Sequence, residues 1–284
     1  VDASSLFWNK DLFEQAGLDP EKAPETWDEI IEAARAINAL GDDIYGFYFA
    51  AACGGCNGYT FMPQIWAAGG DVIDYENHEA ILADDPVARE AFEYYKTMWD
   101  EGLVPEGARA DNGATWITTF ASGKIGIQPL GGGWGITGVI AENPELDFGV
   151  GMLPGKEAGQ TSSFSGGDTI AVTSNAKDVD AAWDFIEWVL SDEVQLEVFA
   201  KNGAFTSRTD LADNEYAAAD QRYVVNNQAL AMGNVPITLG TNEIFNDPNG
   251  PWVAAFITAI LDGDMDGGLQ LGDDGIQDIL DQNY

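Results

Sequence analysis

The sequence predicts an α/β fold. Along its 284 residues, amphipathic stretches alternate with short apolar runs, and helices that separate strands are typical of this class. Hydrophobic residues make up 45% of the chain, which is enough to form a buried core. No apolar run has the length of about 18 residues that a membrane span needs. The length allows one large domain or two modest ones.

Periodicity and end signals predict the individual elements. The chain opens with an aromatic strand and a short helix that stops at Gly17. Thr26 and Glu29 form a capping-box pair, Pro86 suits a first helical turn, and Gly102 follows a helix end. Apolar spacing predicts helices over 26–40, 85–101, 178–190, 192–201 and 250–261. Short apolar runs predict strands at Tyr45–Ala50, Ile125–Pro129, Phe148–Leu153 and Thr169–Thr173.

The charge balance is strongly acidic. Against 48 Asp and Glu stand only 12 Lys and Arg, for a formal net charge of −36. Long-range repulsion therefore opposes binding to nucleic acid or to an anionic membrane surface. At physiological salt the electrostatic screening length is about 8 Å, so neighbouring surface carboxylates repel one another, and near 1 M salt it falls to about 3 Å. Such a surface is typical of a salt-adapted, halophilic protein, and the alternative is an acidic secreted protein from an ordinary environment.

The two cysteines, Cys53 and Cys56, lie in a single Cys-Gly-Gly-Cys motif. A thioredoxin-type site opens a helix, and Gly54-Gly55 is a poor helix start. A structural zinc site would need a second pair of ligands. In an exported protein this spacing predicts a local disulfide that stiffens a loop.

Five segments in the same order resemble a known family. They are residues 6–37, Trp66–Asp71, Phe120–Ile127, Phe164–Val172 and Ala181–Trp188. The first carries the strand, Asn9-Lys10-Asp11 and the helix opened by Thr26-Trp27-Asp28. Together they resemble family 1 extracellular solute-binding proteins, which include maltose-binding proteins and deliver sugars to ATP-binding-cassette (ABC) importers. Gly126 and Ile127 depart from the usual Ala and Met.

The resemblance implies a two-lobe, periplasmic-binding-protein-like (type II) fold. Residues 1–163 and 217–284 would form a nearly complete second lobe, and residues 164–216 would return to an incomplete first lobe. About a hundred first-lobe residues would precede Val1, the size of a typical domain. We therefore expect exposed apolar surface on the returning segment, covered by the rest of that lobe or by another chain. The resemblance also implies an extracellular or periplasmic location, with a lipid anchor upstream, and a membrane permease as partner.

Sugar binding would use an aromatic platform and polar groups at its rim. Trp134 follows Gly131-Gly132-Gly133 at a predicted helix start, where the family has a stacking aromatic. Tyr59 matches a further aromatic position, and Asn57 could add a hydrogen bond. Trp252 stands near another family ligand position, and Trp252, Phe256 and Ile260 also form an apolar helical stripe, so a core role is an equal alternative.

Further site residues come from the hinge positions. Asp2 matches a hinge carboxylate of maltose-binding relatives, or is an exposed terminal residue. Gly166, Gly167 and Asp168 mark the second hinge crossing, where glycines also suit tight turns. Glu243 is a polar loop residue upstream of Trp252 and is the weakest member of the set.

One acidic segment resembles an EF-hand calcium loop rather than anything in the family. Asp occupies loop positions 1, 3 and 5, and an Asp replaces the usual Glu at position 12. In a chain this acidic, the pattern can also arise by chance. The predicted calcium ligands and loop residues are Asp262, Asp264, Asp266, Gly268 and Asp273, and no cofactor other than calcium is expected.

Three functions remain open at this point. A solute-binding protein, not an enzyme, would bind a sugar or oligosaccharide between its lobes, with a polyamine as another solute that carboxylates and tryptophans suit. A secreted glycoside hydrolase would need two carboxylates about 5–10 Å apart. A structural or adhesive acidic cell-surface domain would explain the charge alone. The one histidine, His78, lies in a polar loop, and no G-x-S-x-G motif accompanies it.

Overall fold

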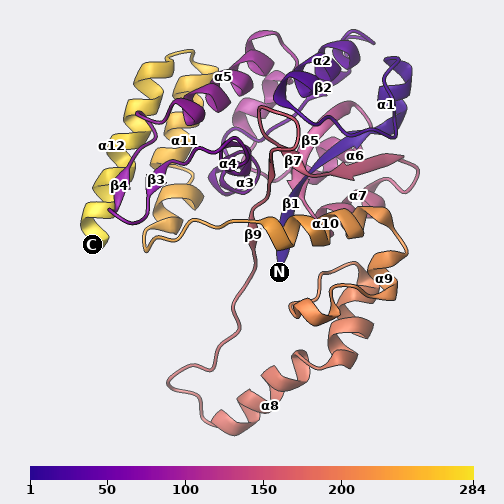
Figure 1. The fold of residues 1–284 in the computed structure, drawn as a ribbon, viewed down its shortest axis with the longest axis vertical. Helices are drawn as coiled ribbons and strands as arrows, with labels where there is room; N and C mark the ends of the chain where they lie inside the picture. The colour runs from indigo at the N-terminus through magenta and orange to yellow at the C-terminus, as the bar shows by residue number, and fades with distance from the viewer.

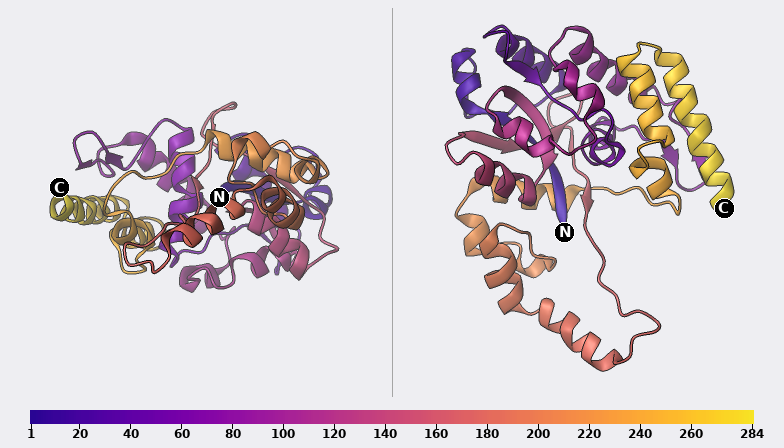
Figure 2. Two further views of the ribbon diagram at one scale, coloured as in Figure 1. Left: turned by 90° about the horizontal axis from the view of Figure 1, so that it is seen from below. Right: turned by 180° about the vertical axis from the view of Figure 1, so that it is seen from behind.

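The computed structural model describes residues 1–284 as a body with a protruding arm (Figure 1). The body comprises residues 1–166 and 219–284, and the arm comprises residues 167–218. Seen from behind, the arm leaves the lower edge of the body as a long extended segment and returns to the body through helical segments (Figure 2, right). No helix is long and apolar enough to cross a membrane.

The body is built on a mixed sheet with the order β2-β5-β1-β6. Strand β1 is antiparallel to β5 and to β6, its first residues also pair with β9, and β2 runs parallel to β5. Seven of the eight β1 residues are buried, so this strand has a protein layer on each face. The strands are β1 (Asp2–Asn9), β2 (Tyr45–Phe47), β5 (Ile125–Gly131), β6 (Phe148–Gly151) and β9 (Ser165–Gly166), with small hairpins β3 (Ile73–Asp74)–β4 (Glu79–Ala80) and β7 (Leu153–Pro154)–β8 (Thr161–Ser162).

Helices surround this sheet, and several begin where a side chain caps them. Asn9, Thr26 and Asp85 accept hydrogen bonds from the first-turn amides of α1, α2 and α5. The body helices are α1 (Lys10–Gln15), α2 (Trp27–Asn38), α3 (Gly54–Thr60), α4 (Met62–Ala67), α5 (Pro86–Asp100), η1 (Glu106–Ala110), α6 (Trp116–Ala121), α7 (Gly133–Glu142), α10 (Gln221–Met232), η5 (Asn242–Asn246), α11 (Pro251–Phe256), η6 (Ile257–Leu261) and α12 (Met265–Asn283). The arm holds α8 (Val179–Val189), η2 (Val194–Phe199), η3 (Ala200–Asn202), η4 (Thr209–Leu211) and α9 (Glu215–Ala218).

The structure confirms the α/β class and four predicted helices: α2, α5, α8 and α11 with η6. The stretch 192–201 is helical too, but as a π-helical and a 3-10 segment. Three predicted strands are present as β2, β5 and β6. The strand predicted at Thr169–Thr173 is wrong, because this segment is exposed extended chain and no neighbouring strand offers it backbone partners.

The core is a single cluster dominated by aromatic side chains. Trp252, at the start of α11, is completely buried and packs against Phe61, Phe92 and Phe245 with ring centroids 5.7–5.9 Å apart. Its predicted role as a ligand platform is therefore wrong. The apolar helical stripe, and not the preceding loop, decides where this side chain points.

The predicted calcium loop is a helix. Asp264 caps α12 by accepting a hydrogen bond from the Gly267 amide, and the residues that follow are helical to Asn283. Gly268 lies so close to η6 that a Cβ would come within 2.5 Å of the Ala259 nitrogen. Gly268 therefore serves close helix packing, and not a turn in a metal loop.

The predicted calcium ligands are engaged elsewhere. Asp262 pairs with Arg109 at 2.8 Å and Asp266 with Arg89 at 2.7 Å. Asp273 accepts a hydrogen bond from the Ala83 amide, which anchors α12 to the loop before α5. No group of three acidic, histidine or cysteine side chains converges here or elsewhere in the chain. The EF-hand prediction is therefore wrong.

The arm exposes large apolar side chains, as the sequence predicts. Of α8, only Ile186 is buried. Trp183, Phe185 and Trp188 are 53–55% exposed, which is far above the exposure of a packed amphipathic helix. The helix thus presents an apolar face with nothing in the chain against it.

Replacement of Trp252 by alanine should destabilise the chain by about 3–5 kcal/mol, because it opens a cavity among packed rings. Trp134→Ala, at a residue 41% exposed, should cost less than about 1 kcal/mol. Urea unfolding followed by far-UV circular dichroism measures both. Equal losses in the two variants would contradict the assignment of Trp252 to the core.

Candidate ligand-binding site

Three of the predicted residues meet at the edge of the body that faces the arm. Asp2 opens β1, Tyr59 lies near the end of α3, and Trp134 lies in the first turn of α7. The Asp2 Oδ1 accepts hydrogen bonds from the amides of Ala3 at 2.9 Å and Gly133 at 3.1 Å. The carboxylate therefore ties the start of β1 to the start of α7. Figure 1 shows this N-terminal end of β1 above the gap that separates body and arm.

The second carboxylate oxygen of Asp2 and the hydroxyl of Tyr59 are buried beside each other, and neither has a partner in good hydrogen-bond geometry. Burial raises the pKa of Asp2 to about 6, while the two amide hydrogen bonds act in the opposite direction. Burial, and after it the negative charge of Asp2, raises the pKa of Tyr59. No lysine or arginine pairs with Asp2.

Trp134 forms an exposed aromatic surface beside these polar groups. Its indole is backed by Trp116, which is nearly buried, with ring centroids 5.6 Å apart at 51°. Gly131 lies directly beneath the indole, and any side chain at that position would collide with it. The glycines before Trp134 thus allow the ring to lie against the backbone.

Two further aromatic residues extend this surface, and the sequence did not single them out. Phe164 lies 4.9 Å from the ring of Tyr59, and Trp66 lies 6.5 Å from Phe164 at 28°. Both are partly buried. They stood within two of the resembling segments, but nothing in their spacing connects them to Tyr59, because the three positions come together only when α4 and the strand end at β9 meet.

Gly166, Gly167 and Asp168 lie at the junction of body and arm. Gly166 pairs with Asp2 across β9 and β1, so its backbone adjoins the site. Gly167, at φ 149°, packs against the backbone of Val1. Asp168 is exposed and lines, with both glycines, a cavity of about 590 Å³ between β9, the arm and α10.

Two other predicted site residues do not reach this group. The Asn57 side chain is buried and donates to the carbonyls of Ala50 and Ala51 at 3.1 and 3.4 Å, so it supports the loop before α3. Its predicted ligand contact is wrong. Glu243 is exposed in η5 and makes no contact with Asp2, Tyr59 or Trp134.

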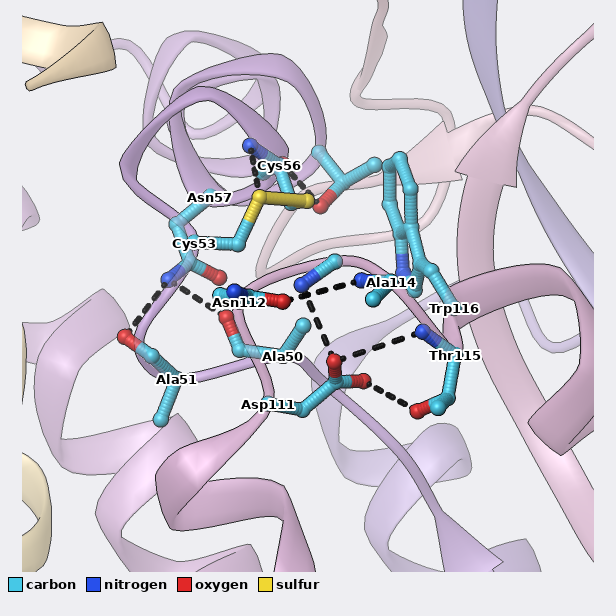
Figure 3. Close-up of a disulfide and its surroundings, with 12 residues drawn as sticks. Ala50, Ala51, Cys53, Cys56, Asn57, Asp111, Asn112, Ala114, Thr115 and Trp116 are labelled. Carbon is cyan, nitrogen blue, oxygen red and sulfur yellow. Dashed lines mark hydrogen bonds between the residues drawn. A yellow bond between two sulfur atoms is a disulfide. The ribbon is translucent and has the colours of Figure 1, made fainter. Parts of the chain in front are cut away.

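Cys53 and Cys56 form a disulfide at the start of α3 (Figure 3). The expectation that Gly54-Gly55 would not open a helix is wrong, because Cys53 is the N-cap of α3 and its sulfur accepts a hydrogen bond from the Cys56 amide at 3.1 Å. A sulfur cap compensates for the two glycines.

The assembled group has the chemistry of a polyol site. It offers a carboxylate oxygen and a hydroxyl without partners next to an exposed indole. Such groups can accept and donate hydrogen bonds to ligand hydroxyls, while the ring covers an apolar C–H face. A buried polar atom left without a partner is costly in a folded protein, so the arrangement is one that a ligand would complete.

Comparison with known proteins places this geometry in a family. The family model described as bacterial extracellular solute-binding protein matches residues 1–196. A putative binding protein of Brucella abortus is 28% identical over 229 residues, and the diacetylchitobiose-binding protein of Streptomyces coelicolor is 28% identical over 267 residues. These matches cover 81% and 91% of the chain but only 53% and 59% of the relatives, so the chain spans little more than half their length.

Solved structures show the same fold. An ABC-transporter solute-binding protein of Thermotoga lettingae, bound to α-D-tagatose, superposes with a TM-score of 0.83 at 22% identity, and covers 98% of this chain. The cyclic α-maltosyl-1,6-maltose-binding protein of Arthrobacter globiformis gives 0.76 at 26% identity. The chain covers 70% and 71% of these two structures, so it holds an incomplete two-lobe fold. The chain belongs to the bacterial extracellular solute-binding protein family.

Proposed function

We propose that this chain is part of the solute-binding component of an ABC importer, and that it binds a neutral sugar or oligosaccharide at Asp2, Tyr59 and Trp134. The observation that carries the proposal is the buried, unpaired Oδ2 of Asp2 beside the exposed indole of Trp134. The names of relatives support the solute class, since they include a diacetylchitobiose-binding protein and a multiple sugar-binding protein of Streptococcus mutans.

Electrostatics favours a neutral solute over an anion. Other relatives are named as binding sn-glycerol-3-phosphate, and a phosphate group would need a positively charged partner. The site instead holds a carboxylate with no lysine or arginine beside it, in a chain of net charge −36. A cationic polyamine is the second solute class, because carboxylates and indoles also suit cations.

In this proposal the solute lies between two lobes, and closure of the hinge presents it to the membrane permease. The exposed face of α8 would be covered by the rest of a first lobe or by another chain. The protein would act outside the cytoplasm, as its family name states. Attachment through an upstream lipid anchor stays a prediction.

The glycoside hydrolase alternative is wrong, because the chain belongs to a family of binding proteins and not of enzymes. The alternative of an acidic cell-surface domain gains no support.

Sugar binding by the 284-residue chain should be weak, because only one wall of the site is present. Binding can be measured by saturation-transfer-difference NMR. We expect a dissociation constant near or above about 1 mM for maltose or diacetylchitobiose, and no signal for glycerol 3-phosphate. Trp134→Ala should abolish the sugar signal, whereas Trp183→Ala, at an exposed tryptophan of the arm, should leave it unchanged.

Three results would contradict the proposal in different ways. Retention of the sugar signal in Trp134→Ala would show that Trp134 is not the aromatic surface on which the sugar binds. Stronger binding of glycerol 3-phosphate or of spermidine than of either sugar would replace the solute class. Micromolar binding of maltose by this chain would show that a second wall is not needed.

The burial of the Asp2 carboxylate should also affect how stability depends on pH. Its folded pKa of about 6 lies above the ordinary 3.8, so between these values the folded chain holds a proton that the unfolded chain releases. Relative to Asp2→Asn, the wild-type unfolding free energy should therefore rise by about 1–2 kcal/mol as the pH falls from 7 to 4, allowing for solvent screening. Urea unfolding at several pH values measures this, and an unchanging difference would contradict the burial of a charged Asp2.

We propose that the surface is adapted to high salt. Twelve ion pairs use twelve different acidic residues, so 36 of the 48 have no cationic partner. The melting temperature should rise between about 0.1 M and 1 M KCl, because screening shortens from about 10 Å to 3 Å. A melting temperature that stays flat across this range would contradict salt adaptation.

A further inference from the structure

The Cys53–Cys56 disulfide lies between the two segments that hold the aromatic groups of the proposed site. One segment is α3, which begins at the bridge and carries Tyr59 near its end. The other is the loop 111–115, which passes directly over the bridge and leads into α6 (Figure 3). Neither the family resemblance nor the proposed function assigns the bridge any role.

Contact between the bridge and the loop is made at Gly113. A Cβ at this position would lie 2.8 Å from the Cys56 sulfur and 2.9 Å from the Cys53 sulfur, closer than real Cβ contacts. Gly113 also has φ 94°, a conformation that favours glycine. The loop backbone therefore rests on the two sulfur atoms.

Beyond Gly113 the loop is held by one buried carboxylate. Asp111 accepts hydrogen bonds from the Gly113 amide at 2.9 Å, the Thr115 hydroxyl at 2.9 Å and the Tyr48 hydroxyl at 2.5 Å. The next residue is Trp116, whose carbonyl accepts from Gln128 at 2.7 Å. The bridge is thus connected to the indole that backs Trp134 by a short segment that these hydrogen bonds hold in place.

We infer that the disulfide is a positioning group for the ligand site. It fixes the position of Tyr59 by holding the start of α3. It fixes the position of Trp134 through a chain of contacts that runs from Gly113 along the loop to Trp116. A disulfide that closes so short a loop removes little conformational entropy from the unfolded chain, because this effect grows with loop length. Its main effect is therefore on the local geometry of the folded chain. The consequence for ligand affinity rests on the proposed function, whereas the consequence for the tryptophan pair does not.

The first readout needs no ligand. Two indoles 5.6 Å apart couple, and Trp134 contributes to the near-UV circular dichroism through this coupling and through its own fixed environment. The readout is this Trp134 contribution, taken as the spectrum of each background minus that of the same background carrying Trp134→Phe. In the Cys53→Ala/Cys56→Ala variant this difference should lose most of its amplitude, while the far-UV spectrum is kept. Dithiothreitol should do the same to the wild type: it transfers two electrons and two protons to the bridge, giving two thiols, and is oxidised to its cyclic disulfide.

A glycine pair provides a matched control that keeps the bridge. Gly113→Ala should reproduce the loss, because its methyl group displaces the loop from the sulfur atoms. Gly159→Ala has a similar φ of 86° but open space around it, so it carries the same backbone strain and should leave the signal intact. If the cysteine variant does not fold, this pair decides the question.

The second readout is maltose affinity by NMR, which should weaken about tenfold without the bridge, equivalent to about 1.4 kcal/mol. An unchanged tryptophan-pair signal in both the cysteine variant and Gly113→Ala would overturn the inference and leave the bridge a stabilising element only. If oxidised wild type binds no maltose, the proposed function fails, and the tryptophan signal still decides the role of the bridge.

Discussion

The body depends on the burial of β1 from both sides. This strand pairs with β5, β6 and β9, and its side chains meet helices on each face, so its register is fixed along its whole length. A shift by one residue would exchange the side chains that pack on its two faces, and they would no longer fit the helices on either side. Because Asp2 is its first residue, the same constraint fixes the carboxylate against α7 and beside the return of the chain at Gly166. The site is therefore as rigid as the sheet at this end.

The site itself combines rigid support with incomplete hydrogen bonding. Backbone amides hold one oxygen of Asp2, and the other oxygen and the Tyr59 hydroxyl are left unpaired. In a folded protein such groups lower stability, and a ligand that pairs with them recovers this free energy on binding. Trp134 and Trp116 add an apolar surface that needs no rearrangement. The opposite wall would come from the side of the arm, where α8 leaves its apolar face uncovered.

Local signals predicted the elements well and the site in part. Caps at Thr26 and Asp85 and the spacing of apolar residues located α2 and α5. The sequence separated Trp134 from Trp252 only in part: both lie close after a glycine at a helix start, and only Trp252 also belongs to an apolar helical stripe. Tertiary contacts distinguish the two residues. The indole of Trp134 lies over the backbone of Gly131 at the surface, whereas Phe61 and Phe92 enclose the indole of Trp252. The acidic segment 262–273 was wrongly predicted to bind calcium for a similar reason, because the tertiary contact of Gly268 packs α12 against η6. Phe164 and Trp66 join the site only through contacts distant in sequence.

The most direct test of the central claim is a crystal structure of this chain grown in a high concentration of maltose. We predict a glucose ring lying on the indole of Trp134, with a sugar hydroxyl within hydrogen-bonding distance of the Asp2 Oδ2 and another near the Tyr59 hydroxyl. Sugar bound only elsewhere, for example in the cavity beside Asp168, with Asp2 and Trp134 unoccupied, would contradict the account.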